Sequence, residues 1–459
     1  MRLSAASCER LGADVTQFTY DRTAQEVGIV HFGIGAFHRA HLAWYTDRAM
    51  DGGDRDWMLA GVSLRSVAVA EQLNPQDGLY TVNERSTASV AIRLVGAVRE
   101  VLVATSAPAD VVSRLKAPAT RIVSFTVTEK GYCRAPDGSL DLALARQGSI
   151  YPLLGEACRQ RRAAGIGGLT LLSCDNLAGN GAQLSCLMRE YLAVEAPDLI
   201  AWFETECACP ATMVDRIVPA TTRADLDAVE GAIGLHDKAA IVTEPFSQWV
   251  IEDRFAGPRP RWEAVGAQLV VDVAPYETAK LRMLNGAHSA LAYLGLQHGH
   301  AYVHQAIADP AIRPLIERLM REEAATSFDP APGQDLTRYA DALIARFSNP
   351  ALQHRLIQIA MDGSQKIPQR WLETLSARQQ RGLQCPSILA ALAAWLRHLR
   401  GANIASWGPV DDPMADRLQQ LARGRDTFDL CQNLFGRDGL FAPSWQGSQQ
   451  DFAVICAAG

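Results

Sequence analysis

A lysine, an asparagine and a histidine in the segment KLRMLNGAHSALAYLG have side chains that suit proton transfer at an alcohol. They are Lys280, Asn285 and His288. A lysine whose pKa is depressed by burial or by nearby positive charge can take a proton from a hydroxyl group. An amide N–H can donate to the oxygen as negative charge develops on it. The segment therefore holds one group that could take a proton from a hydroxyl and another that could stabilise the negative charge left on the oxygen.

These residues need a helix to position them. Apolar residues recur at helical spacing through the segment, and we expect a helix that ends at Gly295. On an ideal α-helix Asn285 and His288 share a face, whereas Lys280 and Asn285 lie roughly 140° apart. A substrate could touch all three only by lying across the first turns. The residues alone also allow a solvated lysine and a hydrogen-bonded core histidine.

A second cluster, GIGAFHRAH, follows an apolar run near the N-terminus. The run predicts a strand over Val27–Phe32, and the residues after it predict a helix. Gly33 permits a tight turn, and Gly35 lets a pyrophosphate approach the helix N-terminus. The third position of the dinucleotide fingerprint is His38, which we expect to pack between helix and strand. A purely structural turn would give the same G-x-G, so the motif alone leaves nucleotide binding open.

The end of the second expected strand bears on the choice between NAD and NADP. NAD sites usually place a carboxylate there to hold the ribose hydroxyls. The sequence has Arg65 and Ser66 and no acid, so the 2′-phosphate of NADP remains possible. The alternative is that Arg65 is an ordinary solvated loop charge.

Short apolar runs alternate with helical stretches through the first half of the chain. The expected strands are Val27–Phe32, Trp57–Leu64, Arg121–Val127, Gly168–Ser173 and Ala240–Thr243. This alternation is typical of βαβ units and predicts a mostly parallel, Rossmann-type sheet. From about residue 277 onward the pattern is helical. The expected fold class is α/β, with a dinucleotide-binding domain over 1–272 and an α-helical substrate domain over 273–459.

Composition limits the function classes. A chain of 459 residues is expected to form two domains, and a net charge of −6 without a long basic block argues against a nucleic-acid binder. Only Cys207 and Cys209 lie close together in the sequence, and a chain of this length does not need disulfides for stability. We therefore expect reduced thiols and a cytoplasmic protein. The N-terminus lacks a signal-peptide stretch, and the run Ile388–Leu396 is too short to span a bilayer.

Segments along most of the chain resemble the long-chain mannitol dehydrogenase family, which includes mannitol 2-dehydrogenase, fructuronate reductase and arabinitol dehydrogenase. The segments are GIGAFHRAH (33–41), VTEKGY (127–132), SCDN (173–176), MVDR (213–216), EPFSQWVIED (244–253), KLRMLNGAHSALAYLG (280–295) and RFSNPALQHR with MDGSQKIPQR (346–370). The spacing Lys-x4-Asn-x2-His is the most specific element, and the last two segments look especially like fructuronate reductases. The resemblance implies an NAD(P)-dependent, zinc-independent oxidoreductase of a polyol or sugar acid, often monomeric.

The resemblance also implies catalytic roles. Lys280 would be the general base, and Asn176 and Asn285 would donate to the reacting oxygen. His288 would bind substrate hydroxyls, and Glu129 would gate a proton path to the lysine. The place of Asn176 suits this independently, because it follows the expected strand at its carboxyl end, where open α/β sheets bind ligands. Its "DNLAGNG" context would also make a good turn.

Binding roles are implied in the same way. Asp215 would contact a substrate hydroxyl, and Lys366 would lie near the cofactor. A substrate carboxylate would need a cation, for which Arg370, Arg355 and Arg282 are the candidates. No metal is implied, since the ligand spacings of a zinc alcohol dehydrogenase are missing. The predicted cofactor contacts are Gly33, Ile34, Gly35, Ala36, Phe37, Arg65, Ser66 and Lys366.

Two other functions remain open at this stage. A methyltransferase also places a glycine turn after its first strand, but it would leave the lysine, asparagine and histidine without a role. A non-catalytic nucleotide sensor could keep the fold and lose turnover.

Overall fold

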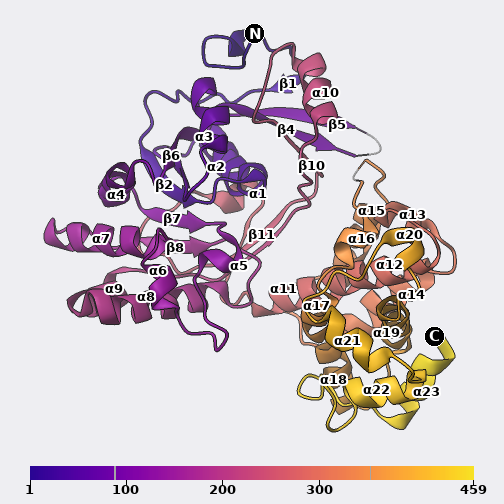
Figure 1. Cartoon of the computed structure of the whole chain (residues 1–459). Coiled ribbons are helices and arrows are strands. Elements are labelled where there is room, and N and C mark those ends of the chain that lie inside the picture. The colour runs from indigo at the N-terminus through magenta and orange to yellow at the C-terminus, as the bar shows by residue number, and fades with distance from the viewer. Residues whose placement is uncertain (87–88, 352, 459) are drawn as a thin grey trace. The chain divides into compact units, whose positions relative to one another are not determined.

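The computed structural model describes residues 1–86, 89–351 and 353–458, and the chain divides into two compact units, Met1–Val273 and Ala274–Gly459 (Figure 1). The first unit is built around a parallel sheet and the second from helices. The α/β fold class is confirmed. Each unit has its own hydrophobic core.

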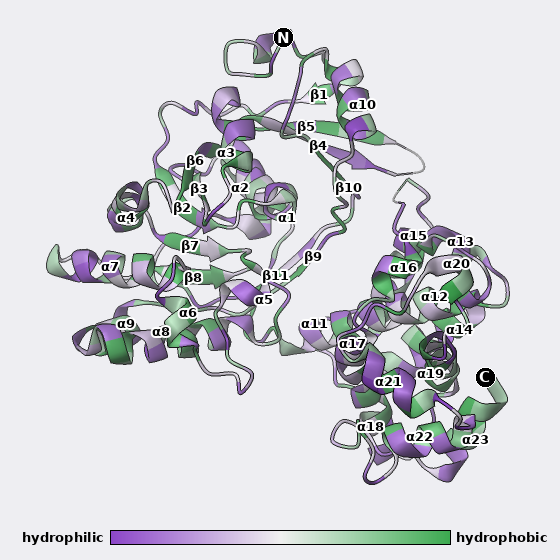
Figure 2. Cartoon of the chain, viewed as in Figure 1, coloured by the Kyte–Doolittle hydropathy of each residue, from purple (hydrophilic) through white to green (hydrophobic). Residues whose placement is uncertain are grey.

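The parallel sheet of the first unit has five strands in the order β6-β3-β2-β7-β8 (Figure 2). All four pairings are parallel. Taken in chain order this is the 3-2-1-4-5 arrangement of dinucleotide-binding folds, in which the strand order reverses beside the first strand. The strands are β2 (Val27–Phe32), β3 (Met58–Ser63), β6 (Val98–Val103), β7 (Ile122–Phe125) and β8 (Thr170–Ser173).

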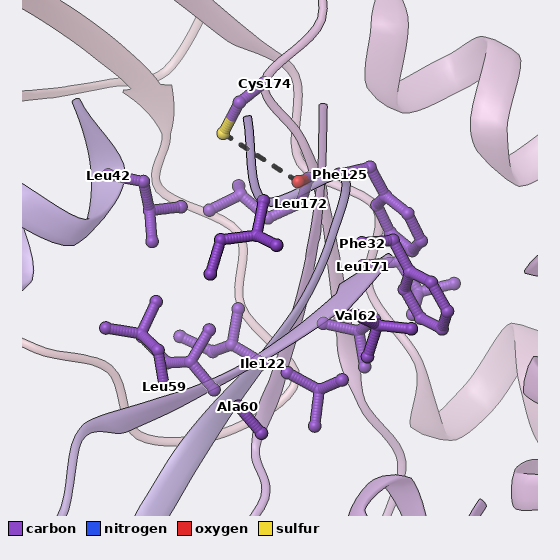
Figure 3. Close-up of a cluster of buried hydrophobic side chains, with 14 of the residues drawn as sticks. Phe32, Leu42, Leu59, Ala60, Val62, Ile122, Phe125, Leu171, Leu172 and Cys174 are labelled. Carbon is purple, nitrogen blue, oxygen red and sulfur yellow. Dashed lines mark hydrogen bonds between the residues drawn. The ribbon is translucent and has the colours of Figure 1, made fainter. Parts of the chain in front are cut away.

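Burial on both faces explains the nearly continuous apolar runs of these strands. Every residue of β2, β7 and β8 is buried. Figure 3 shows Phe32, Phe125 and Leu171 side by side in this core, and Figure 2 shows apolar residues along strands β7 and β8. The helices of the unit are α1 (Ala36–Ala40), α2 (Leu42–Asp51), α3 (Ala68–Leu73), α4 (Pro108–Lys116), α5 (Thr128–Gly131), α6 (Leu142–Ala145), α7 (Ile150–Ala163), α8 (Asn180–Glu195), α9 (Ile200–Glu206) and α10 (Arg223–Ile233).

Two smaller sheets complete the first unit. The expected strand at 240–243 exists as β10 (Ile241–Thr243), but it pairs with β4 (Tyr80–Arg85) outside the parallel sheet. The remaining strands of the unit were not predicted, because several are short and carry polar residues that break an apolar run. They are β4 and β6, together with β1 (Val15–Thr16), β5 (Val90–Val95), β9 (Thr212–Asp215), β11 (Gln248–Glu252) and β12 (Gln268–Val270).

Two imidazoles fill the contact between β2 and α1. The rings of His31 and His38 are stacked with centroids 3.4 Å apart, so His38 does pack between helix and strand. His31 bonds to Ser124 Oγ at 2.8 Å and Thr126 Oγ1 at 2.9 Å, whereas both ring nitrogens of His38 are buried without a partner among the described residues. Burial lowers the pKa of His31 to about 3 and that of His38 well below its usual range.

The stack predicts acid sensitivity. As the pH falls below about 6.5, the unfolded chain binds a proton on His38 that the folded chain excludes. The free energy of unfolding therefore decreases as the pH decreases. We expect His38→Leu to remove a slope of about 1.4 kcal/mol per pH unit from the unfolding free energy of the first unit. Denaturant melts from pH 7.5 to pH 5 measure this. A pH slope in His38→Leu equal to that of the wild-type protein would contradict the assignment.

The second unit has only helices among its described elements. α12 (Gly286–Gln297) is buried almost throughout and packs against α19 (Pro386–Leu399). Gly295 lies inside α12, so the expected helix end there is wrong: a Cβ on it would lie 2.5 Å from Leu356 Cδ1, and close packing explains the glycine. No described helix is long and apolar enough to cross a membrane. The other helices are α11 (Ala274–Ala279), η5 (Lys280–Asn285), α13 (Val303–Ala308), α14 (Arg313–Arg318), η6 (Leu319–Ala324), α15 (Leu336–Phe347), α16 (Leu356–Ile359), α17 (Gly363–Ile367), η7 (Pro368–Leu372), α18 (Glu373–Gln380), α20 (Ile404–Trp407), α21 (Ala415–Ala422), α22 (Thr427–Phe435) and α23 (Gln449–Ala458).

Candidate active site

The glycine turn connects β2 to α1 as the sequence predicts. Gly33 has φ +91°, and a Cβ on it would lie 2.0 Å from the carbonyl oxygen of Thr126, so the fold itself requires this glycine. A Cβ on Gly35 would meet nothing closer than Gly33 O at 3.8 Å. Protein packing therefore does not explain Gly35, and open space beside its backbone suits the approach of a phosphate.

The side chains after the two glycines divide between packing and exposure. Ile34 is buried and fills the space above Gly61, where an added Cβ would lie 2.2 Å from Ile34 Cδ1, so only its backbone can face a ligand. Phe37 is half-buried and stacks on His41 with ring centroids 5.0 Å apart. Arg39 does not present its charge to a ligand, because its guanidinium is buried and donates to Ala239 O at 2.7 Å.

The loop after β3 carries no carboxylate. Arg65 is exposed and forms no hydrogen bond or ion pair with a described residue. Ser66 is exposed, and its Oγ accepts a bond from the amide of Ala68 at 3.2 Å. Both side chains can therefore turn toward a ligand at the end of β3.

Asp175, which the sequence analysis did not identify, connects the ends of β7 and β8 through hydrogen bonds. Asp175 accepts bonds from the amides of Val127 and Thr128, both at 3.0 Å, and from the hydroxyl of Tyr132 at 2.8 Å. Burial raises the pKa of Asp175, and the charge of Glu129 adds to the effect. The only signal for it was its place beside Asn176 in SCDN.

Asp175 thereby positions two of the predicted catalytic residues. Thr128, which it holds, has φ +64°, a conformation unusual for a residue other than glycine. Glu129 follows directly in α5, and Asn176 follows Asp175 after β8. Both side chains are exposed at the carboxyl ends of their strands, where this fold binds ligands.

Asp215 ends β9 and is buried. The neighbouring guanidinium of Arg216 is also buried, forms an ion pair with Glu84 and donates to Glu244 O at 2.9 Å. It lies over the ring of Trp44, 4.6 Å from the centroid. Arg216 thus fixes the backbone on which Asp215 sits.

The lysine–asparagine segment of the second unit is a π-helix, η5, rather than the α-helix expected. The amide of Gly286 donates to Leu281 O, five residues earlier. With i→i+5 bonding, residue i+5 lies about one turn above residue i, so Lys280 and Asn285 share a face instead of lying far apart around the helix. π-Turns are rare and frequent at functional sites. This overturns the requirement that a substrate lie across the helix.

His288 follows one α-turn later and is buried, with Nε2 lacking a partner among the described residues. It contacts the rings of Phe347 at 4.8 Å and His354 at 5.3 Å between centroids. Burial lowers the pKa of His288 well below its usual range, and the neighbouring His354, Arg346 and Arg370 lower it further. A neutral imidazole with a free nitrogen can bond to a hydroxyl group.

Arg370 lies beside this face. Its Nη1 donates to Ser289 Oγ at 2.8 Å and to Asn285 O at 3.4 Å, and it forms no ion pair with a described residue. Burial lowers the pKa of Arg370 to about 10. A partly buried cation without a counterion is costly, and a bound anion would relieve that cost.

The other candidate cations are arranged differently. Arg282 donates to Ser327 O and Oγ at 3.0 and 2.9 Å and lies 3.9 Å from Glu373, so its charge is already engaged. Arg355 is exposed at the start of α16. Lys366 donates to Met361 O at 2.7 Å, and burial followed by the charge of Arg370 lowers its pKa.

The predicted site residues therefore form two groups. Asn176, Glu129 and Asp215 lie at strand ends of the first unit, with the glycine turn. The second unit brings together the other predicted residues on and beside the η5–α12 face, namely Lys280, Asn285, His288 and Arg370.

Two family models match the chain. The mannitol dehydrogenase Rossmann domain matches residues 27–264, and the mannitol dehydrogenase C-terminal domain matches residues 272–444. A D-mannonate oxidoreductase of Escherichia coli is 40% identical over 97% of this chain and 95% of its own. A mannitol 2-dehydrogenase of Phaeosphaeria nodorum is 36% identical over 95% of this chain and 80% of its own.

Solved structures agree. The mannitol 2-dehydrogenase of Pseudomonas fluorescens, in a ternary complex with NAD and D-mannitol, gives a TM-score of 0.84 at 33% identity, covering 100% of this chain and 96% of that one. A substrate-free D-sorbitol dehydrogenase gives 0.93 at 30% identity, covering 100% and 97%. The methyltransferase alternative is therefore dropped. The chain belongs to the mannitol dehydrogenase family and is an oxidoreductase of the polyol and sugar-acid type.

Proposed function

We propose that the protein interconverts a secondary alcohol of a sugar acid or polyol with the corresponding ketone, using a nicotinamide dinucleotide and Lys280 as the base. The observation that carries this is the π-turn of η5, which puts Lys280 and Asn285 on one face. Lys280 takes the hydroxyl proton, and Asn285 and Asn176 donate to the oxygen as it becomes alkoxide-like. No metal is needed for the reaction.

Neighbouring residues complete the proposed reaction site. The partnerless Nε2 of His288 bonds to a second substrate hydroxyl, which fixes the carbon that reacts. Asp215, held by Arg216, bonds to another hydroxyl. Glu129 passes the proton between the lysine and solvent, on the loop that Asp175 holds.

The first unit has the features of a dinucleotide site. Packing does not explain why residue 35 is a glycine. Its backbone is open to the approach of a pyrophosphate. A nicotinamide bound here would supply or accept the hydride. Backbone groups of Ile34 and Ala36 and the ring of Phe37 border the pyrophosphate. Lys366 remains a proposed cofactor contact, together with Arg65 and Ser66 at the ribose.

The finer proposal is that the substrate is a sugar acid, of the mannonate–fructuronate kind. Arg370 supports it, because this partly buried guanidinium has no anionic partner among the described residues and contacts the backbone of Asn285. A planar carboxylate fits a guanidinium fork better than a hydroxyl does. Mannitol–fructose and arabinitol are the alternatives.

Paired substrates test this. The purified protein is assayed for NADH and NADPH formation with mannonate, mannitol and arabinitol, and for their consumption with fructuronate and fructose. We expect the highest kcat/KM for the pair with a carboxylate. Higher kcat/KM for fructose than for fructuronate would reject the sugar-acid proposal, and no turnover with tight nucleotide binding would favour the non-catalytic sensor.

The exposed loop after β3 gives a prediction about the cofactor. We expect Val67→Asp or Ala68→Asp to shift the ratio of kcat/KM for NAD over NADP upward by at least about tenfold, because a carboxylate repels the 2′-phosphate and bonds to the ribose hydroxyls. Arg65→Ala should raise the KM for NADP alone. An unchanged ratio in all three variants would show that this loop does not contact the ribose.

A further inference from the structure

Two histidines and an aspartate converge at the far end of the helix that carries the candidate catalytic face. His298 Nδ1 and His300 Nε2 both lie 2.9 Å from Asp309 Oδ2. One potential ligand atom from each residue lies within 4.8 Å of the others. Around a zinc ion at about 2.1 Å, tetrahedral ligand atoms lie about 3.4 Å apart, so small side-chain rotations would admit an ion.

We propose that His298, His300 and Asp309 bind a divalent transition-metal ion, with zinc as the expected occupant. Imidazole and carboxylate ligands suit Zn²⁺, and three protein ligands leave a fourth position for water. The proposal is independent of the function proposed above. The sequence analysis did not identify this site. Its ligands form a His-x-His pair followed nine residues later by Asp309, and this pattern lacks the cysteines of common zinc motifs.

The backbone holds all three ligands in place. The amides of His298 and His300 both bond to Gly295 O, at 3.1 and 2.9 Å, and Gly299 between them has φ +83°, so the end of α12 sets both imidazoles. The other carboxylate oxygen of Asp309 accepts the amide of Ala311 at 2.8 Å. This bond aims Oδ2 at the imidazoles, as outer-shell partners do in metal sites.

The electrostatics favour a cation at this place. The C-terminal end of a helix carries partial negative charge, and α12 ends directly before His298. The imidazoles and the amide of Ala311 hold the pKa of Asp309 below its usual range, so its carboxylate is charged at neutral pH.

The ion would act on structure and not on the reacting atoms. His298 lies thirteen residues beyond Asn285 along the helix, or about 20 Å at 1.5 Å per residue. Through its ligands the ion would connect the C-terminal end of α12 with the turn between α13 and α14, where Asp309 lies.

Calorimetric titration of the chelator-stripped, full-length protein with ZnCl₂ tests the proposal, with Co²⁺ absorption reporting the ligand geometry. We expect one saturable site per chain, and at least tenfold weaker binding in His300→Ala and Asp309→Asn. His236→Ala is the matched control: His236 pairs with Glu230 on the surface and should not contribute. Melts without metal confirm that each variant folds. No saturable binding, or equal affinity in wild type and His300→Ala, would overturn the proposal.

Discussion

Lys280→Ala should lower kcat by about 10²- to 10⁴-fold, the range that a positioned base contributes, while nucleotide affinity stays within about threefold of wild type. The alanine removes the proton acceptor and leaves the glycine turn of the first unit untouched. The alcohol oxygen would then have to lose its proton to water. The measurement is steady-state kinetics in both directions, with nucleotide affinity from fluorescence titration.

Two further variants sharpen that result. Lys238→Ala, at an exposed lysine of the first unit, should retain wild-type kcat. Asn285→Ala should lower kcat about 10²- to 10³-fold with the lysine still present, because it removes a donor to the developing negative charge. If Lys280→Ala kept more than a tenth of the wild-type kcat, the lysine would not be the base. If Lys238→Ala lost activity equally, the effect would not be specific to the η5 face.

The sequence predicted the central architecture because its signals are local. The apolar runs that became β2, β3, β7 and β8 are buried on both faces, and such runs are visible without knowing the partners. β10 was found as a strand but placed in the wrong sheet, since pairing with β4 depends on residues far away in the chain. Gly295 illustrates the same limit, because its contact with Leu356 is tertiary.

The sequence analysis named candidate site residues but could not give their geometry. Lys280, Asn285 and His288 were identified, yet their relation depended on a π-turn that helical spacing does not reveal. Asp175 was missed because its role is to join two strand ends through Val127 and Thr128. The choice among three arginines required knowing that the charge of Arg282 is already engaged, a fact only the folded chain supplies.

That choice yields the second large effect. We expect Arg370→Met to lower kcat/KM for a sugar acid by at least about 30-fold, equivalent to about 2 kcal/mol, because truncating one partner of a buried charge pair typically costs that much or more. The neutral polyol, which lacks the carboxylate, should lose less than about fivefold through the smaller disturbance at Ser289 and Asn285. The discriminating quantity is the ratio of the two losses, measured on one preparation.

Matched variants separate charge from fit. Arg370→Lys keeps the positive charge without the planar fork, so we expect it to recover part of the sugar-acid activity and none of the bidentate advantage. Arg282→Met removes a neighbouring cation whose charge is already engaged by Ser327 and Glu373, and it should alter both substrates equally. Equal losses for acid and polyol in Arg370→Met, or an acid-specific loss in Arg282→Met, would move the carboxylate site away from Arg370. A loss of sugar-acid activity that is selective and confined to Arg370→Met would indicate that the substrate carboxylate is the anionic partner of Arg370. The partly buried guanidinium beside the η5–α12 face has no such partner among the described residues.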